Sequence, residues 1–339
     1  MAWDLIGHDW AADLLSRHVA SGQVRHAYLI TGPEGVGKRA LALQFVQALH
    51  CQQPPAPGGR CGECTNCRQI RAQRLPDLHE VVRAENETLL GIDAIRDLRR
   101  RLALSSFGGS WRVALLTDFQ DATIEAQNAL LKTLEEPAPK VVLIVLALQA
   151  DLLLATIVSR CEVLGLRPVP AGSIAAALEA RGETAERARL LAALSGGRPG
   201  LALRLASDQE ALDLRSKQLD DLRRLLGASR AAQFAFAEAL AGRRRDLELE
   251  AKRRETLSVL ETWLSLWRDA LLVASGAEVT LANPDWAAEA ERLAESVGLE
   301  GARQALAAVD RTLDAVRRNA NLQLALETLF LDLPRIPNR

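Results

Sequence analysis

The sequence predicts an α/β region followed by an all-α region, and three observations support this fold class. In the first half of the chain, short apolar runs alternate with segments of helical periodicity, which is typical of a parallel sheet flanked by helices. A glycine-rich loop joins the first apolar run to such a helical segment. After Ala171 no further strand pattern is found, and Ala, Leu, Arg and Glu recur at helical spacing.

Five strands are expected in the first half of the chain, with helices between them. We place them at residues 27–31, around 80–82, and at 112–118, 141–147 and 162–166. The apolar run from 141 to 148 lacks alternation, as expected for a strand that is buried on both faces.

Proline and glycine positions divide the chain into three predicted parts. Pro168 and Pro170 end the α/β region, and a glycine-rich break interrupts the helical pattern that follows. We expect parts at residues 1–168, 169–207 and 208–339. An apolar stripe in the last part recurs at helical spacing and indicates core packing or a subunit contact. Its members are Leu257, Leu260, Trp263, Leu264 and Trp267.

Composition and charge exclude several classes of protein. The chain has 339 residues and a formal net charge of -1, so it lacks the basic excess of a protein that binds nucleic acid by itself. Its 6 Phe, 6 Trp and 1 Tyr are few for a protein that binds single strands by stacking. No apolar run approaches the roughly 18 residues of a membrane-spanning helix. The first residues lack the pattern of a secretory signal, so we expect a cytoplasmic protein.

The segment GPEGVGKR at residues 32–39 has the pattern of a phosphate-binding loop. Such a loop needs glycines that turn backbone N–H groups inward, a lysine for the outer phosphates and a helix N-terminus behind them. Gly32, Gly35, Gly37 and Lys38 meet these needs. The next position normally holds Mg²⁺ through Ser or Thr, but Arg39 offers no oxygen ligand. The loop is therefore expected either to bind ATP or ADP weakly or to serve only as a structural turn.

A second acidic signature is also incomplete. The predicted strand at 112–118 ends at Asp118, the usual position of a metal-binding Asp, but Phe119 replaces the catalytic carboxylate that usually follows. Without that carboxylate and without the loop hydroxyl, no group orients Mg²⁺ or the attacking water. We expect no independent ATPase activity from this chain.

Four of the five cysteines, Cys51, Cys61, Cys64 and Cys67, lie within one short segment. In a reducing compartment such clustering indicates a metal rather than disulfides. Four thiolates closing one tetrahedral site are typical of structural zinc, so a zinc module is predicted at about residues 51–67. An iron–sulfur cluster and four incidental thiols are the alternatives. Cys161 stands apart and is most simply a small buried residue.

Two basic stretches are typical of solvated helix surfaces, with contact to DNA phosphate as the alternative. One consists of Arg96, Arg99, Arg100 and Arg101 on one face of a predicted helix. The other is the run of three arginines at residues 243–245.

Ordered motifs lie between residues 26 and 161. HAYL at 26–29 precedes the phosphate loop and the cysteine segment, NALLKTLEEP occupies 128–137, and LLATIVSRC occupies 153–161. In these motifs the chain resembles the AAA+ clamp-loader subunits of bacterial DNA polymerase III, and among them the delta-prime subunits. The resemblance implies an AAA+ P-loop core with a parallel sheet and a zinc-binding insertion. It also implies a small helical lid at 169–207 and a C-terminal helical collar domain at 208–339.

The resemblance implies partners as well. Clamp-loader motor subunits and a delta subunit would join this chain in a hetero-oligomeric ring, which uses ATP to open the sliding clamp and place it on primed DNA. The clamp and the DNA are expected to meet this chain through the complex, and no membrane is involved. The chain would then be part of the DNA polymerase III holoenzyme, a DNA-directed DNA polymerase as a complex.

Departures from the family pattern indicate the kind of subunit. Ala147 and Leu148 stand where active motor subunits carry a polar residue, and Gly200 stands where they carry a lid arginine. Together with Arg39 and Phe119, these departures imply a stationary, non-hydrolysing subunit. One alternative is a catalytically active AAA+ ATPase of the clamp-loader type. The other is a zinc-stabilised nucleotide-binding adaptor unconnected with replication.

Arg160 is the arginine of the SRC segment at residues 159–161. In the family that the chain resembles, this arginine acts in trans, as an arginine finger on the γ-phosphate held by a neighbouring subunit. The resemblance implies the same role for Arg160. Without it, an ion pair with a local carboxylate such as Glu162 would be the simpler expectation.

Overall fold

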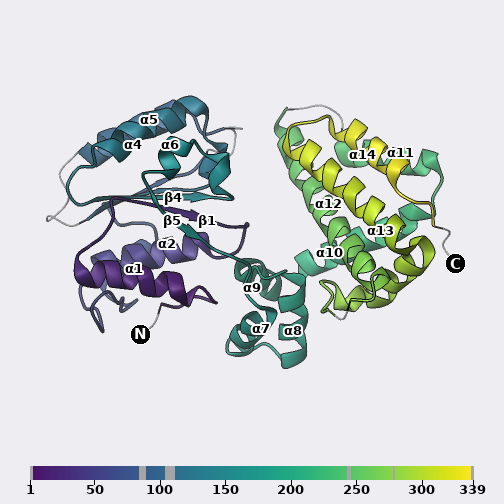
Figure 1. Ribbon diagram of the computed structural model, residues 1–339, viewed down its shortest axis with the longest axis horizontal. Helices are drawn as coiled ribbons and strands as arrows, with labels where there is room; N and C mark the ends of the chain where they lie inside the picture. Colours follow the sequence, from purple (N-terminus) through teal and green to yellow (C-terminus); the bar gives the residue numbers. More distant parts are fainter. Residues whose placement is uncertain (1–2, 84–88, 104–110, 243–245, 278, 337–339) are drawn as a thin grey trace. The chain divides into compact units, whose positions relative to one another are not determined.

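The computed structural model describes residues 3–83, 89–103, 111–242, 246–277 and 279–336 (Figure 1). Contacts divide the chain into two compact units. The first, called the sheet unit below, comprises residues 1–177 and 197–201, and the second, the helical unit, comprises residues 178–196 and 202–339. The predicted sequence of an α/β region and an all-α region is confirmed. The contacts divide the segment 169–207 between the two units, and the three-part division stays a prediction.

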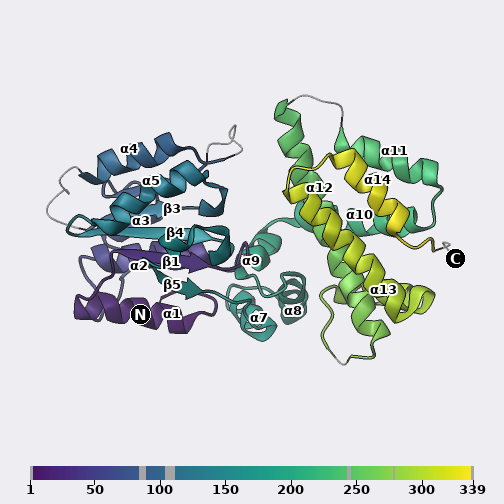
Figure 2. The same ribbon diagram turned by 45° about the horizontal axis from the view of Figure 1, so that its top comes forward.

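The sheet unit contains five parallel strands in the order β2-β3-β4-β1-β5 (Figure 2). Their bounds are β1 Ala27–Thr31, β2 Leu78–Val81, β3 Arg112–Leu116, β4 Val141–Ala147 and β5 Glu162–Gly165. Two strands have the predicted bounds, and the others differ by one or two residues. The predicted strand at 112–118 ends early because Asp118 adopts a left-handed backbone conformation (φ 48), which stops the ladder.

Helices cover both faces of this sheet (Figure 1). On one face lie α1 (Asp9–Ser21) and α2 (Lys38–His50), and on the other lie α4 (Ile92–Ala103), α5 (Ile124–Glu135) and α6 (Ala155–Val158). Alternate residues of β1 serve the two layers: Tyr28 and Ile30 join the core with α1 and α2, whereas Leu29 joins the core with α4 and α5. Every residue of β4 is buried, as the lack of alternation predicted. The central strands β1 and β4 are therefore buried along their whole length, whereas the edge strand β5 keeps exposed residues.

Short elements complete the two units. They are α3 (Thr65–Arg71), α7 (Ala171–Glu179), α8 (Ala185–Leu194), α9 (Pro199–Ser207) and the 3₁₀ turns η2 (Phe119–Asp121), η3 (Ala150–Leu152) and η4 (Pro284–Trp286). Of the two basic stretches, residues 243–245 lie outside the described residues. Within the described parts of the chain, no helix is long and apolar enough to cross a membrane.

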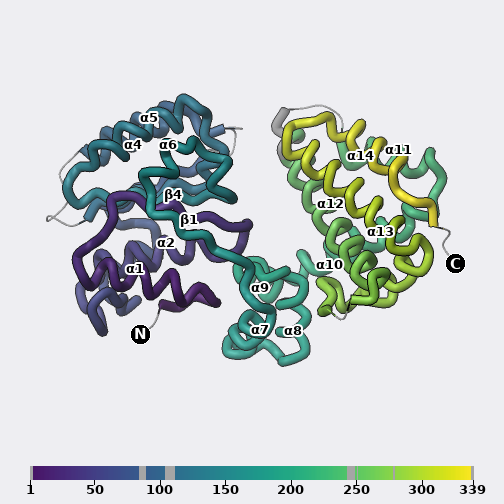
Figure 3. The backbone as a smooth tube through the Cα atoms, viewed as in Figure 1, coloured from purple at the N-terminus to yellow at the C-terminus, as the bar shows by residue number. Residues whose placement is uncertain are grey.

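Most of the helical unit is built from five longer helices (Figure 3). They are α10 (Gln209–Leu226), α11 (Arg230–Ala241), α12 (Asp246–Ala274), α13 (Ala287–Arg317) and α14 (Leu322–Asp332). The long helices α12 and α13 pack along each other. The predicted apolar stripe is core: Trp263 and Trp267 are fully buried, and the Trp263 indole donates a hydrogen bond of 2.8 Å to the carbonyl oxygen of Gln218. The stripe therefore packs within the core of this unit.

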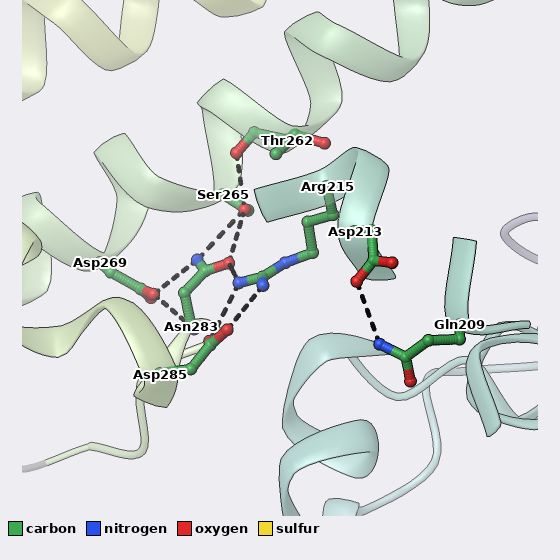
Figure 4. Close-up of polar contacts among 8 residues, drawn as sticks. All are labelled: Gln209, Asp213, Arg215, Thr262, Ser265, Asp269, Asn283 and Asp285. Atoms are coloured by element: carbon green, nitrogen blue, oxygen red, sulfur yellow. Dashed lines mark hydrogen bonds and ion pairs between the residues drawn. The ribbon is translucent and has the colours of Figure 1, made fainter. Parts of the chain in front are cut away.

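A buried polar network fixes the segment between α12 and α13 (Figure 4). The fully buried Asp269 carboxylate accepts hydrogen bonds from the backbone N–H of Ala282 at 2.9 Å and from the backbone and side-chain N–H groups of Asn283, both at 2.7 Å. Arg215 on α10 donates to the Asn283 side-chain oxygen at 2.6 Å and forms an ion pair with Asp285 at 2.7 Å. Asn283 thus connects α10 and α12, through Arg215 and Asp269, in the segment that leads to α13.

Replacing Asp269 by Ala should destabilise the helical unit by about 2–4 kcal/mol, because it leaves several buried donors without an acceptor. Asp213→Ala is the matched control, since Asp213 is exposed and accepts one side-chain hydrogen bond from Gln209. Its effect should stay within about 0.5 kcal/mol. Denaturant unfolding followed by tryptophan fluorescence measures both. Equal effects from the two variants would contradict a structural role for the network.

Candidate functional site

The loop that follows β1 has the backbone geometry of an anion cradle. Gly32 and Gly37 have φ values of 145 and 117, which only glycine adopts readily. A Cβ atom at Gly32 would lie 2.6 Å from the carbonyl oxygen of Leu166, so no larger residue fits there. Gly37 directly precedes α2, which begins at Lys38. The four predicted residues therefore stand together at the N-terminus of a helix, where backbone N–H groups favour an anion.

Lys38 is folded onto the loop itself. Its Nζ donates hydrogen bonds to the carbonyl oxygens of Gly32 at 2.6 Å and Pro33 at 3.1 Å, and its side chain is buried. Burial lowers the pKa of Lys38, an effect opposed by the carboxylates of Asp118 and Glu34. An incoming phosphate must replace these two hydrogen bonds, which weakens its net gain.

Arg39 forms a bidentate ion pair with Glu80. Its Nε and one terminal nitrogen lie 2.9 and 3.0 Å from the two carboxylate oxygens of Glu80 on β2. The Glu80 side chain is mostly buried, whereas that of Arg39 is about half exposed. Sequence reasoning identified Arg39 but missed Glu80, which lies 41 residues further along the chain.

The other positions at which the chain departs from the family pattern are apolar or sterically closed. Phe119 is fully buried in the core formed with α4 and α5, where a glutamate would carry an unpaired charge. Ala147 is fully buried at the end of β4, and the carbonyl oxygen of Leu148 accepts a hydrogen bond from the Gly32 N–H at 3.1 Å. At Gly200 a Cβ would lie 2.9 Å from the carbonyl oxygen of Gly35, so an arginine there would require the loop to move.

A cavity of 630 Å³ lies beside the loop, and sequence reasoning missed it. Its lining includes His8, the half-exposed Trp10, Arg167 and Pro168. His8 Nε2 lies 3.1 Å from the carbonyl oxygen of Val36, a hydrogen bond that joins the cavity wall to the phosphate loop. These residues come from two segments that lie far apart in the sequence, at residues 7–10 and 165–173.

The four predicted metal ligands come together at the end of α2. The sulfurs of Cys51, Cys61, Cys64 and Cys67 all lie within 4.8 Å of one another. The sulfur of Cys61 lies 3.6 Å from that of Cys51 and 4.0 Å from that of Cys67. A tetrahedral zinc with Zn–S bonds of about 2.3 Å separates its ligands by about 3.8 Å, so the donor set fits this metal.

Backbone groups favour the thiolate form of Cys61, whereas burial raises the pKa of the Cys51 and Cys67 thiols. The N–H groups of Cys64 and Glu63 lower the pKa of the Cys61 thiol to about 6. The Arg60 side chain donates to the amide oxygens of Gln44 and Gln47 on α2, and Gln47 donates to the carbonyl oxygen of Cys67. These contacts hold the cysteine segment against α2. No position in the cluster is provided for a reacting water, so the arrangement is suited to structure rather than catalysis.

Arg160 lies at the amino ends of the strands, whereas the phosphate loop lies at their carboxyl ends. It precedes β5, and β5 runs parallel to β1, whose other end leads into the loop. The length of β5 therefore lies between Arg160 and the end of the sheet that carries the loop. The predicted local partner Glu162 lies 3.9 Å from Arg25, and Arg160 instead contacts Glu135 at 2.9 Å. Burial raises the pKa of the neighbouring Cys161 thiol to about 11.

The basic face of α4 forms ion pairs within its own helix. Arg96 lies 3.2 Å from Asp93, and Arg100 and Arg101 lie 3.2 and 2.7 Å from Asp97. The side chains of these three arginines are exposed. This arrangement agrees with the predicted solvated surface.

Comparison with known proteins assigns much of the chain to replication proteins. Residues 7–170 match the family model described as DNA polymerase III, delta subunit. DNA polymerase III subunit delta-prime of Pseudomonas aeruginosa is 37% identical over 222 residues, which cover 65% of this chain and 67% of that protein. The Escherichia coli delta-prime subunit is 36% identical over 203 residues, 58% of this chain and 60% of that protein.

A DNA polymerase III gamma-subunit-related protein from Thermotoga maritima aligns with 94% of this chain and 97% of its own length. The identity is 18% and the TM-score is 0.41.

Replacing Cys64 by Ser should remove the metal and loosen residues 51–67 while the sheet persists, because the cluster lies outside the two cores of the sheet unit. Elemental analysis of protein purified without chelator should find zinc, and X-ray absorption should give Zn–S distances of about 2.3 Å. Cys161→Ser is the control and should retain zinc. Iron in place of zinc, or no metal at all, would overturn the prediction.

The phosphate loop should bind nucleotide weakly, with less than about a threefold change when Mg²⁺ is removed, because backbone N–H groups and Lys38 supply the attraction. Lys38→Ala should weaken binding by about tenfold or more. The exposed Lys132 provides a control, since Lys132→Ala removes the same charge elsewhere in the sheet unit. Calorimetric titration with ATP and ADP measures these affinities, and strong Mg²⁺ dependence would count against the prediction.

Proposed function

The chain belongs to the family of DNA polymerase III delta-prime subunits, and from this premise we propose that it is a stationary, non-hydrolysing subunit of the clamp loader. In this role it assembles with ATP-hydrolysing motor subunits and a delta subunit in a ring within the cytoplasm. The ring loads the sliding clamp onto primed DNA, and this chain contributes Arg160 to the nucleotide site of a neighbour.

The single observation that best supports a non-hydrolysing role is the Arg39–Glu80 ion pair. The position that would supply a hydroxyl to Mg²⁺ is occupied by Arg39. Its guanidinium donates hydrogen bonds to both carboxylate oxygens of the mostly buried Glu80. Hydrolysis needs the metal and an oriented water, and Phe119 offers no group for the latter. The alternative of an active ATPase requires both to be supplied by other means, and no contact of the described residues favours it.

The position of Arg160 supports action in trans. Its recorded partners are Glu135, Thr156 and Ser159, none of which belongs to the phosphate loop. Because Arg160 lies at the opposite end of the strands from its own phosphate loop, it is suited to contact a nucleotide held by another subunit. An arginine in this role stabilises charge on the transferred phosphoryl group.

The cysteine cluster supports the same role indirectly. Cys51 caps the C-terminus of α2, whose N-terminus carries Lys38. We propose that zinc fixes this end of the helix and takes no part in chemistry, and that the loop at the other end holds nucleotide as a structural ligand.

Arg160→Ala should leave folding, zinc content and assembly intact, yet slow single-turnover ATP hydrolysis at the neighbouring site by about 10³-fold or more. Arg160→Lys should be a poor substitute, because lysine lacks the planar fork. Arg96→Ala, which removes an exposed arginine paired with Asp93, is the matched control. Complexes reconstituted with the partner ATPase subunits are needed for this measurement. Full clamp-loading activity of the Ala variant would exclude the role in trans, and turnover by the isolated chain would exclude the non-hydrolysing role.

A further inference from the structure

We propose that Glu135 holds Arg160 in a resting position, from which the nucleotide of a neighbouring subunit withdraws it. This inference rests on the proposed action of Arg160 in trans. It assigns to Glu135 the role of a positioning residue, which sets how readily the arginine becomes available.

The contact joins two segments that the fold brings together. Glu135 is the last residue of α5, and Arg160 follows the end of α6. These helices pack on the same face of the sheet (Figure 1). A terminal nitrogen of Arg160 lies 2.9 Å from Glu135 Oε1. The partial negative charge at the C-terminus of α5 attracts the guanidinium to the same place.

The terminal nitrogens that would grip a phosphate are both engaged. One lies against Glu135, and the other donates to the carbonyl oxygen of Thr156 at 3.0 Å. A forked contact with a phosphate requires the guanidinium to present two N–H groups on one side. The carboxylate also cancels part of the positive charge that the phosphate would experience. Arg160 therefore has to leave Glu135 before it can act fully on a neighbour.

The exposure of the pair makes this exchange reversible. The side chains of Arg160 and Glu135 are 37% and 51% exposed. An ion pair with that exposure shifts an equilibrium by about fivefold at most. A triphosphate carries several negative charges against the single charge of Glu135, so it can displace the carboxylate. A buried pair would instead lock the arginine in place.

The chain provides a matched control in the next residue. Glu136 is the C-cap of α5, and its backbone N–H donates to the carbonyl oxygen of Lys132. It is a second exposed carboxylate of the same type, one position from Glu135. Glu135→Gln and Glu136→Gln remove one charge each with almost no change in shape.

The test compares single-turnover ATP hydrolysis in complexes reconstituted with the partner ATPase subunits. Glu135→Gln should lower the ATP concentration for half-maximal rate by about two- to fivefold and leave the maximal rate unchanged. Glu136→Gln should match the unaltered chain. The difference should shrink at high salt, because exposed charges are screened. Glu135→Gln combined with Arg160→Ala should behave like Arg160→Ala alone.

The outcomes separate the inference from its premise. If Arg160→Ala hydrolyses ATP normally, the action in trans fails and the inference with it. If Arg160→Ala is slow but Glu135→Gln equals the unaltered chain, only the inference is overturned. A lower maximal rate for Glu135→Gln would also overturn it, since Glu135 would then aim the arginine rather than withhold it. Thermal unfolding followed by circular dichroism should be the same for all four variants and the unaltered chain.

Discussion

Coverage of the sheet on both faces is the constraint on which the rest of the sheet unit depends. Because α1 and α2 cover one face and α4, α5 and α6 the other, the central strands are lined by apolar side chains on both faces. The carboxyl ends carry the phosphate loop, while the amino ends are preceded by Glu135 and Arg160. Because the strands are parallel, their carboxyl and amino ends lie at opposite ends of the sheet, so the fold itself separates the phosphate loop from Arg160.

Helix α2 runs between the two ends of the sheet. It begins at Lys38 and is capped by Cys51, and its 13 residues span about 20 Å. The positive end of its dipole faces the anion cradle, and the cysteine cluster lies at the negative end. Four thiolates around Zn²⁺ would add negative charge at that end, which Arg60 is placed to offset through its contacts with Gln44 and Gln47. The cysteine cluster and the phosphate loop therefore lie at the two ends of one helix.

Much of this arrangement follows from sequence because it depends on local pattern. The apolar runs of β1 and β4, the glycines of the loop and the spacing of the cysteines each lie within a short segment. The sequence could not predict ion-pair partners that only the tertiary fold brings together. Glu80 faces Arg39 from a strand 41 residues away, and Glu135 takes Arg160 although Glu162 is nearer in sequence. Glu162 belongs to β5, whose pairing with β1 brings it near Arg25 instead.

Arg39 and Arg160 are held in different ways. Arg39 is fixed by two short hydrogen bonds to a carboxylate that is only 17% exposed, in a fork that satisfies both oxygens. Arg160 makes a single contact of this kind to a carboxylate that is half exposed. The cost of breaking an ion pair rises with burial and with the number of hydrogen bonds lost. The Arg39–Glu80 contact should therefore cost more free energy to break than the Arg160–Glu135 contact.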